Sequence, residues 1–381
     1  MSDQFPDRPP GGGASRKPRV AIVFGGRSSE HAISCVSAGS VLAAIDRDAY
    51  DVVPIGISRE GRWVLVADEP AKLAITGGTL PAVEESGSPV VLSGDPTSRG
   101  MVVLEPGKVP RELGSVDVVL PLLHGPYGED GTMQGLLELA GVGYVGSGVF
   151  ASAAAMDKGH MKALLAAAGL PTGPYAVVTP RQWATDRAAV RETVAGLGFP
   201  AFVKPCRAGS SVGITKVRDP DALDEAIETA RSHDPRVIVE ALVEGREIEC
   251  GVLEGLEGGE PEASVPGEIV VTGHEFYDFD AKYLPDEGTR LDVPADLPAD
   301  VVDQIRAMAC AAFDALTCEG LARVDFFLEA GGRVLVNEVN TMPGFTPSSM
   351  FPLLWKATGL DYPGLVDRLI RTAVQRPTGL R

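Results

Sequence analysis

The segment from Leu321 to Ser349 restricts the possible folds of this chain more than any other, because it has the pattern of a β-hairpin. Its sequence is LARVDFFLEAGGRVLVNEVNTMPGFTPSS. Gly331 and Gly332 are expected to form a two-residue turn, which a Gly-Gly dipeptide favours between two strands. Apolar side chains fill much of both strands: Phe326, Leu328, Leu335, Val336 and Val339. A surface hairpin with scattered charges is the alternative, but strands this apolar indicate that the polar face points into the protein.

This turn gives the hairpin a face that carries an arginine, two carboxylates and an amide. It places Asp325 opposite Glu338. In the same register Arg323 faces Asn340, and the alternation of side chains puts both pairs on one face. Opposed carboxylates, with Cβ atoms about 5 Å apart, repel each other unless a positive charge lies between them. Oxygen ligands from Asp, Glu and Asn suit Mg²⁺ or Mn²⁺ rather than zinc. We therefore predict a dication site formed by Asp325, Glu338 and Asn340.

Composition indicates a globular enzyme of two or three domains. The chain has 381 residues, of which 44% are hydrophobic. No run approaches the roughly 20 apolar residues that a membrane-spanning helix needs. Residues 1–17 are polar and rich in Gly and Pro, so we expect a disordered tail rather than a signal peptide, and a cytoplasmic location. A formal charge of −18 argues against nucleic acid or an anionic membrane as a partner.

Periodicity along the chain predicts an α/β and α+β protein with three parts. Strand, glycine-rich turn and helix follow one another from RVAIVFG onward, and the later strand VDVVLPLLHG continues the pattern of a parallel sheet. We expect an N-terminal α/β domain at 18–148, with an insertion of short strands at 59–115. A small α+β domain follows at 149–243 and opens with one Ala-rich helix. The remainder, 244–381, contains a long loop at 273–294, the hairpin and a terminal helix.

A glycine-rich turn after the strand FPAFVKP has the features of a phosphate-binding loop. Lys204 lies near the end of this strand, and Gly209, Ser210, Ser211 and Gly213 follow it. Backbone amides in such a turn can surround phosphate oxygens while the lysine supplies positive charge. No GK[ST] follows the glycines, so this is not a Walker A loop. A mobile hairpin tip is an equal alternative from these residues alone.

Other positions could complete a nucleotide site. Lys158, near the start of the Ala-rich helix, is a second candidate cation for phosphates, although a lone lysine is usually solvated. The backbone from Glu240 through Ala241 to Leu242 could hydrogen-bond a base edge, and Glu247 could accept from ribose hydroxyls. A linker with surface acids is the alternative for this stretch.

Two residues of the N-terminal part are candidates for substrate binding. Glu30 lies at a strand-to-helix turn, where its carboxylate could hold the ammonium group of a small substrate or could cap the helix. The glycines before it do not match the dinucleotide fingerprint. His124 ends the strand in LPLLHGPYGEDG, a position that favours a site loop, although a lone loop histidine is more often structural.

Two segments of the C-terminal part could border the same site. Lys282 and Tyr283 lie in the long loop, and a loop of about 20 residues with little regular structure often serves as a lid. Gly344 and Ser349 follow the hairpin and could offer a backbone amide and a hydroxyl to a carboxylate. A turn that caps the next helix is the competing account for these two residues.

Taken together and in this order, these motifs resemble the D-alanine–D-alanine ligases of the ATP-grasp superfamily. The resemblance covers nearly all of residues 19–370, and its most specific segments are HGPYGEDGTMQG, KPCRAGSSVG, FYDFDAKY, RVDFFL and NEVNTMPGFTPSS. It implies a three-domain ATP-grasp architecture in which ATP lies between the central and C-terminal domains. The insertion at 59–115 is similar to that of a longer subtype.

The resemblance also implies contacts with ATP and its metal ions. Lys158 and Lys204 would bind the phosphates, the backbone from Glu240 to Leu242 the adenine, and Glu247 the ribose. Further residues would lie at the ATP: Ser210, Ser211, Lys282, Asn337 and Glu338. Two Mg²⁺ or Mn²⁺ ions would be held by Asp325, Glu338 and Asn340.

For the amino-acid substrates, the resemblance implies two binding places. Glu30 would hold the ammonium group of the first D-alanine, with His124 beside it. Through Ser210 and Tyr283, Glu30 would also connect three domains over the substrates. The residues implied at the second D-alanine and at the developing oxyanion are Arg323, Gly344 and Ser349.

The implied reaction joins two D-alanines with ATP through a D-alanyl phosphate, for peptidoglycan precursor synthesis. The Lys282-Tyr283 pair favours D-alanine as the acceptor. A D-alanine–D-lactate or D-alanine–D-serine ligase is the near alternative, and a non-catalytic ATP-grasp nucleotide-binding protein is the distant one. The expected partners are small-molecule substrates and a second copy of the chain in a homodimer.

Overall fold

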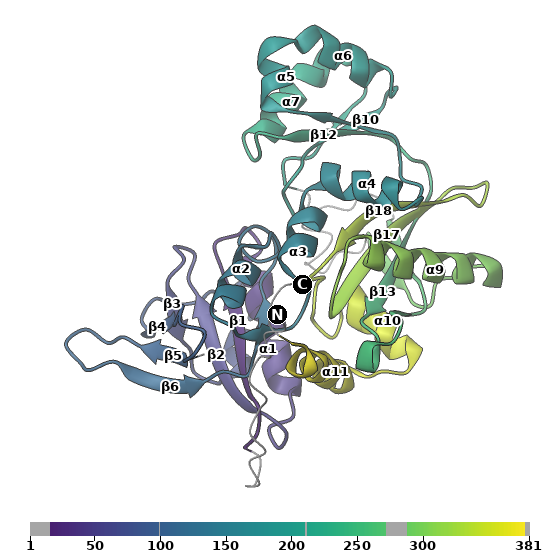
Figure 1. Ribbon diagram of the computed structural model, residues 1–381. Helices are drawn as coiled ribbons and strands as arrows, with labels where there is room; N and C mark the ends of the chain where they lie inside the picture. Colours follow the sequence, from purple (N-terminus) through teal and green to yellow (C-terminus); the bar gives the residue numbers. More distant parts are fainter. Residues whose placement is uncertain (1–15, 99, 210–211, 272–287, 378–381) are drawn as a thin grey trace, which may run out of the picture.

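The computed structural model describes residues 16–98, 100–209, 212–271 and 288–377. Its strands form three sheets in three parts of the molecule, and each sheet is built from a successive stretch of the chain (Figure 1). Within the described residues no helix is long and apolar enough to cross a membrane.

The first sheet combines a parallel core with an antiparallel extension. Its eight strands have the order β6-β5-β4-β3-β2-β1-β7-β8. They are β1 (Arg19–Gly25), β2 (Asp51–Ile57), β3 (Trp63–Leu65), β4 (Ser88–Leu92), β5 (Gly100–Val103), β6 (Arg111–Ser115), β7 (Val118–Leu122) and β8 (Gly143–Tyr144). β2, β1, β7 and β8 pair in parallel, which confirms the predicted parallel sheet. The predicted insertion supplies β3 to β6, which extend the sheet antiparallel from β2.

Two helices follow strands of this parallel core. α1 (His31–Ala44) follows β1, and α2 (Thr132–Leu139) follows β7. Almost every residue of β1 is buried, which explains why its sequence RVAIVFG is apolar without alternation. The loops after β1 and β7 leave the same edge of the sheet, because the two strands are parallel neighbours. The residues that follow these strands therefore lie close to one another.

The prediction of one Ala-rich helix is wrong, because the segment forms two. α3 (Val149–Met156) ends at Asp157, and α4 (Lys158–Ala167) begins directly after it. Asp157 leaves helical geometry, with φ −87° and ψ 100°, and its side chain accepts from the N–H groups of Gly159 and His160. An aspartate in this position satisfies N–H groups that have no partner inside the helix. Lys158 is thereby fixed at the first turn of a helix.

The second sheet belongs to a small unit with its own core. Its antiparallel order is β11-β10-β12-β9. The strands are β9 (Tyr175–Val178), β10 (Ala201–Pro205), β11 (Thr215–Val217) and β12 (Val237–Ala241), and the helices are α5 (Pro180–Thr185), α6 (Arg187–Ala195) and α7 (Leu223–Arg231). The buried side chains of this core all come from residues 178–239. Figure 1 shows the unit at the top, attached to the rest through α4 and the segment after β12.

The third sheet has six strands, of which five follow the order β16-β15-β13-β17-β18 and β14 pairs with β13. They are β13 (Arg246–Leu253), β14 (Glu262–Ala263), β15 (Gly267–Val271), β16 (Thr289–Asp292), β17 (Leu321–Leu328) and β18 (Val334–Asn340), with helices α9 (Ala299–Ala315), α10 (Met350–Thr358) and α11 (Tyr362–Gln375). The predicted loop at 273–294 is wrong at its end, because β16 pairs there with β15. Side chains of α10 and α11 share one core with the first sheet.

The hairpin of β17 and β18 has the predicted pairs but not the predicted turn. Asp325 faces Glu338 and Arg323 faces Asn340, as expected. The turn is longer than two residues, since Glu329 N–H donates to Arg333 O and closes three residues between them. A bulge after Asp325 then shifts the register by one residue. The one-residue shift at the bulge offsets the difference between the predicted and the observed turn. The four polar residues therefore keep the expected partners.

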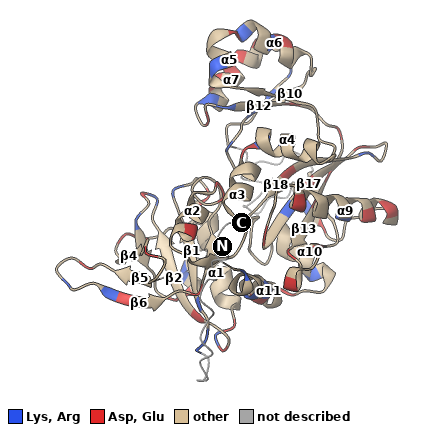
Figure 2. Cartoon of the chain, in the orientation of Figure 1, with Lys and Arg blue, Asp and Glu red and all other residues tan. Residues whose placement is uncertain are grey.

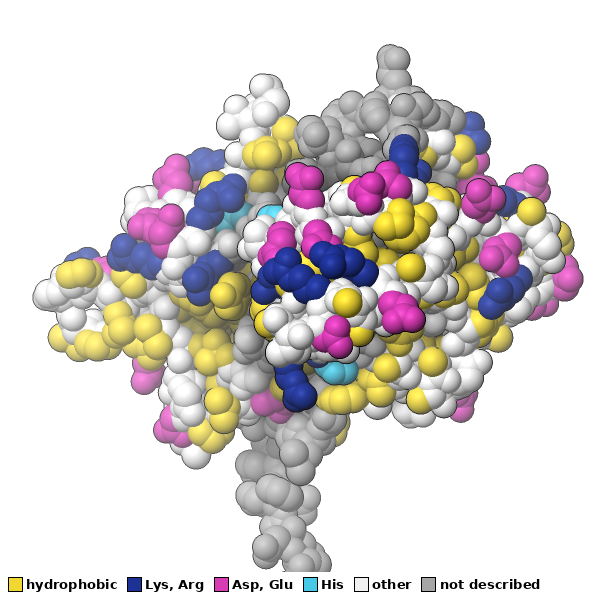
Figure 3. Space-filling view, turned by 90° about the horizontal axis from the view of Figure 1, so that it is seen from above, with side chains coloured by type: hydrophobic (Ala, Val, Ile, Leu, Met, Phe, Trp, Pro, Cys, Tyr) yellow, Lys and Arg dark blue, Asp and Glu magenta, His cyan; other side chains and the backbone are white. Residues whose placement is uncertain are grey.

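Positions of Lys, Arg, Asp and Glu are distributed over all three parts of the molecule (Figure 2). Figure 3 looks down on the side of the second sheet and shows Lys and Arg side chains next to Asp and Glu side chains. Ion pairs join such residues on α6 and α7, where Arg191 contacts Asp224 and Arg231 contacts Glu228. The arginines on these helices are therefore largely neutralised by neighbouring carboxylates.

Candidate active site

A cavity of about 790 Å³ lies between the three sheets and takes lining residues from each of them. Every predicted site residue that the structure describes lines this cavity: Glu30, His124, Lys158, Lys204, Glu240, Ala241, Leu242, Glu247, Arg323, Asp325, Asn337, Glu338, Asn340, Gly344 and Ser349. The remaining four lie outside the described residues: Ser210, Ser211, Lys282 and Tyr283. Residues far apart in the sequence thus meet at one place, while their individual roles stay predictions.

One wall of the cavity is a polar face shared by β13, β17 and β18. The guanidinium of Arg323 donates to both carboxylate oxygens of Asp325, from Nε at 2.7 Å and from Nη2 at 2.8 Å. Asn340 Nδ2 donates to Asp325 Oδ2 at 3.0 Å. Glu338 faces Asp325 across the strands. Part of the positive charge that the facing carboxylates require is therefore supplied by Arg323.

Lys158, Lys162 and Lys204 also line the cavity. Lys204 Nζ lies 2.6 Å from Glu240 Oε2, and Lys162 Nζ lies 2.9 Å from Glu240 Oε1. Lys158 Nζ donates to Ala208 O at 2.9 Å and lies 4.0 Å from Glu338 Oε2. Burial alone would raise the pKa of Glu240, but the charges of Lys204 and Lys162 outweigh it and hold that pKa well below its usual range. Two lysines pair with Glu240 and the third lies near Glu338, so three ammonium groups gather at a place that suits an anion such as a triphosphate.

Lys162 is a residue that the sequence reasoning missed. It lies one helical turn after Lys158 on α4, so both lysines face the same way. Its side chain is almost fully buried, and its ammonium also donates to Asn337 O at 3.0 Å. The spacing of the two lysines in MDKGHMK was the available signal.

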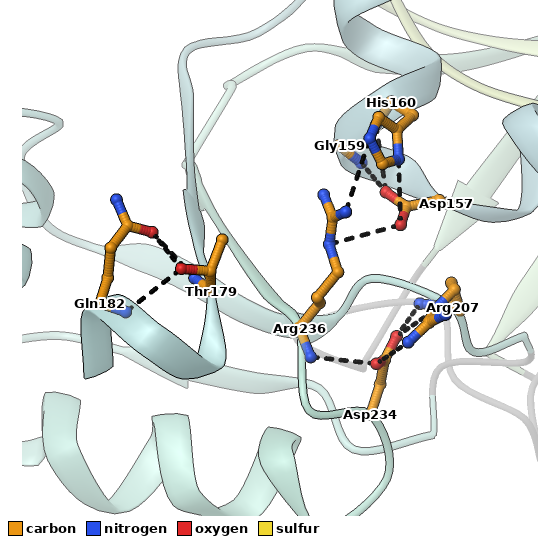
Figure 4. A network of polar contacts seen from close by, with 8 residues as sticks. All are labelled: Asp157, Gly159, His160, Thr179, Gln182, Arg207, Asp234 and Arg236. Atoms are coloured by element: carbon orange, nitrogen blue, oxygen red, sulfur yellow. Dashed lines mark hydrogen bonds and ion pairs between the residues drawn. The ribbon is translucent and has the colours of Figure 1, made fainter. Parts of the chain in front are cut away.

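A chain of charged residues connects the start of α4 with the base of the loop after β10 (Figure 4). Asp234 accepts from the N–H of Arg207 at 2.8 Å and from its guanidinium at 2.9 and 2.7 Å. The same carboxylate accepts from the N–H of Arg236 at 3.0 Å. The guanidinium of Arg236 lies 3.5 Å from Asp157, the residue that caps α4. The start of α4 and the base of the loop are thus held together beside Lys158 and Ala208, which line the cavity.

Glu30 reaches the cavity from the N-terminal end of α1. It is the residue that precedes the helix, yet its side chain makes no capping hydrogen bond, so the capping alternative is not supported. Only 6% of the residue is exposed. A Cβ atom at Gly209 would lie 2.5 Å from its Oε2, and one at Gly125 would lie 2.7 Å from it. Two glycines thus let the loop after β10 and the loop after β7 close tightly around this carboxylate.

His124 links the first sheet to the segment after the hairpin. Its Nδ1 lies 3.0 Å from Met342 O, and its Nε2 lies 3.5 Å from Ser37 Oγ. Burial lowers the pKa of His124, so the ring is neutral near pH 7. A neutral ring that donates to Met342 O fixes the relative position of these two segments.

Glu129 is a second residue that the sequence reasoning missed, although it belongs to the quoted motif HGPYGEDG. Its carboxylate accepts from Gly125 N–H at 2.7 Å and from Met342 N–H at 3.1 Å, and it lines the cavity. Burial, together with the negative charge of Glu30, raises the pKa of Glu129 to about 8. A carboxyl group that keeps its proton near neutral pH therefore lies close to Glu30.

This raised pKa predicts how stability depends on pH. An unfolded chain releases the Glu129 proton near pH 4.5, whereas the folded protein keeps it up to about pH 8. Between these values the folded state binds more protons, so stability is highest at the acidic end and falls as pH rises, by at most about 1.4 kcal/mol per pH unit from this group. Chemical unfolding of the ligand-free protein at several pH values should show this slope.

Glu129→Gln is the matched variant for that measurement. The quantity to compare is the slope of the free energy of unfolding against pH, rather than the stability at one pH. Gln cannot titrate, and it keeps only one oxygen for the two N–H donors. We expect a flatter decline between pH 5 and 8 than in the unmodified protein. Identical slopes in the two proteins would show that Glu129 titrates normally.

Two N–H groups of the stretch predicted to contact a base edge have acceptors within the chain. The N–H of Ala241 donates to Pro174 O at 3.0 Å, and the N–H of Leu242 donates to Pro200 O at 3.2 Å. Neither donor can therefore serve a base edge. Val243 also lines the cavity, and its N–H has no acceptor among the residues that the structure describes. The Val243 N–H is thus a further candidate donor beside the predicted stretch, whose contact with a base stays a prediction.

Gly344 and Ser349 lie together beyond the hairpin. A Cβ atom at Gly344 would come within 3.2 Å of Ser349 Oγ. Ser349 directly precedes α10 but makes no capping hydrogen bond to it. Instead its Oγ accepts from Thr346 N–H at 3.2 Å. The hydroxyl is therefore held at the cavity by the turn before the helix.

Two family models match this chain. The one described as D-ala D-ala ligase N-terminus matches residues 19–147, and the one described as D-ala D-ala ligase C-terminus matches residues 164–371. The chain belongs to the D-alanine–D-alanine ligase family. The predicted resemblance is thereby confirmed, and the chain is an enzyme of the ligase class.

Family members with high identity extend over nearly the whole chain. The D-alanine–D-alanine ligase of Kineococcus radiotolerans is 61% identical over 372 residues, which are 96% of this chain and 99% of that protein. The ligase of Streptomyces griseus is 59% identical over 375 residues, 96% of this chain and 95% of that protein.

Solved structures of family members have the same fold. The D-Ala:D-Ser ligase VanG from Enterococcus faecalis is 37% identical, has a TM-score of 0.82, and covers 94% of this chain and 100% of its own. The D-alanine-D-alanine ligase from Coxiella burnetii is 35% identical, has a TM-score of 0.79, and covers 95% of both chains. These likenesses confirm the predicted ATP-grasp fold class.

Proposed function

We propose that this protein joins two D-alanines to D-alanyl-D-alanine with ATP, releases ADP and phosphate, and supplies a peptidoglycan precursor. The single observation that carries this proposal is the cavity. It brings a lysine cluster, a face of oxygen ligands and a buried carboxylate into one enclosed space, in a chain of the D-alanine–D-alanine ligase family. These are the parts that phosphoryl transfer to a small carboxylate requires.

ATP fits the cavity with its phosphates at the lysine cluster. Lys158, Lys162 and Lys204 would compensate the phosphate charge, and the loop with Ser210 and Ser211 would cover it. At the base end, Val243 N–H would donate to the adenine edge, and Glu247 would accept from the ribose. Glu240 would keep Lys162 and Lys204 in place, since it contacts both.

The residues of the hairpin face fit two Mg²⁺ or Mn²⁺ ions. Asp325, Glu338 and Asn340 offer carboxylate and amide oxygens on one face, and Asn337 lines the cavity beside them. The described residues contain no group of three or more His, Cys, Asp or Glu side chains that could hold a metal ion, so these residues would be only part of the ligand set. A site of this kind suits ions that share their coordination with phosphate oxygens. When bound, such ions would neutralise the charge that develops on the transferred phosphoryl group.

In the first step, a carboxylate oxygen of one D-alanine attacks the γ-phosphorus of ATP, and the bond to ADP breaks. The product is D-alanyl phosphate. Glu30 would hold the ammonium group of this D-alanine, and the neutral His124 would border it. The lysines would hold the phosphates in line with the attacking oxygen.

In the second step, the free amine of the other D-alanine attacks the acyl carbon, loses a proton, and phosphate leaves with its bridging oxygen. Arg323 and the Gly344 N–H would stabilise the oxyanion of the tetrahedral intermediate. Ser349 would contact the carboxylate of this second substrate. We propose that Lys282 and Tyr283, outside the described residues, close over the site with Ser210 and exclude water from the acyl phosphate.

The identity of the acceptor is the point on which family members differ. VanG is named a D-Ala:D-Ser ligase, and the other relatives reported above are named D-alanine–D-alanine ligases. We propose D-alanine, in line with the Lys282-Tyr283 pair. Phosphate release should be rapid with D-alanine and ATP alone. Turnover that starts only when D-lactate or D-serine is added would contradict this choice.

We also propose a cytoplasmic homodimer. ATP, the co-substrate, is a cytoplasmic metabolite. Four apolar side chains are exposed on the adjacent helices α2 and α3: Leu136, Leu139, Val149 and Phe150. Exposed apolar side chains that gather in one region often mark an interface. Light scattering should give twice the mass of one chain, and the mass of a single chain would contradict the dimer.

A further inference from the structure

Arg323 donates to Asp325 and lies within ion-pair distance of a second carboxylate, that of Glu249. Its Nε lies 2.7 Å from Asp325 Oδ1 and 3.0 Å from Glu249 Oε2. Glu249 is on β13, directly opposite Asp325 in the antiparallel register, so both carboxylates point to the same face of the sheet. Glu249 also lines the cavity, with only 4% of the residue exposed. A carboxylate buried to this extent is costly unless a cation compensates it, and Arg323 lies within reach.

Within the proposed function, the Asp325 carboxylate would have to bind both Arg323 and a metal ion. Arg323 takes both of its oxygens in a bidentate contact, and the same oxygens are the ones a dication would need. A dication bound to Asp325 would also repel the guanidinium that contacts the same carboxylate. The two cations can coexist only if Arg323 has another acceptor on the side away from the metal. Glu249 is in that position, because it lies on β13, whereas the other proposed ligands lie on β18 on the opposite side of β17.

We propose that Glu249 is a positioning residue that holds Arg323 while Asp325 serves the metal. This inference rests on the proposed function. Glu249 keeps the guanidinium at the acyl carbon, where it faces the oxyanion, and leaves the Asp325 carboxylate available as a metal ligand. Glu249 touches neither substrate nor metal, and it acts through Arg323.

The test is Mn²⁺ binding in the presence of ADP, measured by electron paramagnetic resonance on Glu249→Gln. Gln keeps the shape of the side chain but loses the charge that attracts Arg323. Arg323 then competes for Asp325, and we expect Mn²⁺ affinity to fall about tenfold and kcat to fall about 10- to 100-fold, as for other residues that orient metal ligands. Glu249→Asp keeps the charge and should recover most of the Mn²⁺ affinity.

Glu268→Gln is the matched control. Glu268 lies on the neighbouring strand β15 and forms a similar pair with Arg246, at 2.8 and 2.6 Å, but neither residue lines the cavity. This variant should leave Mn²⁺ affinity and kcat unchanged. Equal losses of Mn²⁺ affinity and kcat in Glu249→Gln and Glu268→Gln would overturn the proposal. They would show a general effect of removing a carboxylate from the sheet.

A double-mutant comparison separates the action through Arg323 from direct attraction between Glu249 and the metal. In the Arg323→Met background there is no guanidinium to compete for Asp325, so Glu249→Gln should lower Mn²⁺ affinity far less than in the unmodified protein. The same loss in both backgrounds would overturn the proposal, as would unchanged Mn²⁺ affinity in Glu249→Gln. Because the readout is metal binding, it decides this inference even if the unmodified protein makes no dipeptide.

Discussion

Glu338→Gln should lower the rate of ATP-dependent ligation by at least about 10²- to 10³-fold, the loss expected when a group that stabilises transition-state charge is removed. Glu338 faces Asp325 on the cavity wall and lies near Lys158. Gln has nearly the same shape but carries no charge for a dication. The side chain is 27% exposed, so the fold should be unaffected. Phosphate release at several Mg²⁺ concentrations measures the loss, and a thermal melt checks the fold.

Glu329→Gln provides the control on the same hairpin. Glu329 lies at the turn, and its side chain is paired at 4.0 Å only with the exposed Arg333 among the described residues. It does not line the cavity, so this variant should retain normal turnover. A Glu338→Gln protein with nearly normal turnover would contradict the metal assignment.

Arg323→Lys should lower dipeptide formation by about 10²- to 10³-fold. Lys keeps the positive charge but has no planar fork, so it cannot contact Asp325 and Glu249 and still face an oxyanion. We expect the rate of the second step to fall more than the rate of the first step. Hydroxylamine traps an acyl phosphate as a hydroxamate, so the ratio of D-alanine hydroxamate to dipeptide should rise in the variant.

Arg246→Lys is the control for this variant. Arg246 makes a bidentate contact with Glu268 in the same sheet and lies away from the cavity. The Arg246→Lys substitution should leave the ratio of D-alanine hydroxamate to dipeptide unchanged. A proportional fall of hydroxamate and dipeptide in Arg323→Lys would mean that Arg323 serves the first step and not the oxyanion.

Sequence reasoning succeeded where local patterns decide the outcome. The alternation of residues in RVDFFL and VLVNEVN brought Arg323, Asp325, Glu338 and Asn340 to one face, which the structure confirms. The buried parallel strand RVAIVFG was equally clear from its unbroken apolar run. In both cases strand geometry determines which side chains are buried or share a face, so the pattern of residues predicts the strand directly.

It failed where a backbone detail depends on the rest of the fold. The three-residue turn and the bulge after Asp325 cannot be told from a plain Gly-Gly turn, because both give the same pairs at the site. Asp157 lies inside an Ala-rich stretch that was predicted as one helix, yet its carboxylate caps a new helix. The N–H groups of Ala241 and Leu242 looked available because their acceptors, Pro174 and Pro200, are distant in sequence.

The missed residues share one cause. Lys162, Glu129 and Glu249 are charged side chains that appear as ordinary surface residues in the sequence. Each becomes notable only through partners from other parts of the chain, namely Glu240, Met342 and Arg323. The energetic weight of a buried charge comes from such partners, so it becomes visible only in three dimensions.

We expect the carboxylate of one D-alanine to be activated as an acyl phosphate in this cavity. D-alanine labelled with ¹⁸O in its carboxylate tests it directly, with mass spectrometry of the phosphate released during turnover with ATP and Mg²⁺. One labelled oxygen must pass to phosphate, because it forms the bond to phosphorus in the first step and leaves carbon in the second. We predict singly labelled phosphate in equal amount to ADP and D-alanyl-D-alanine. Unlabelled phosphate, or AMP as the nucleotide product, would contradict the account.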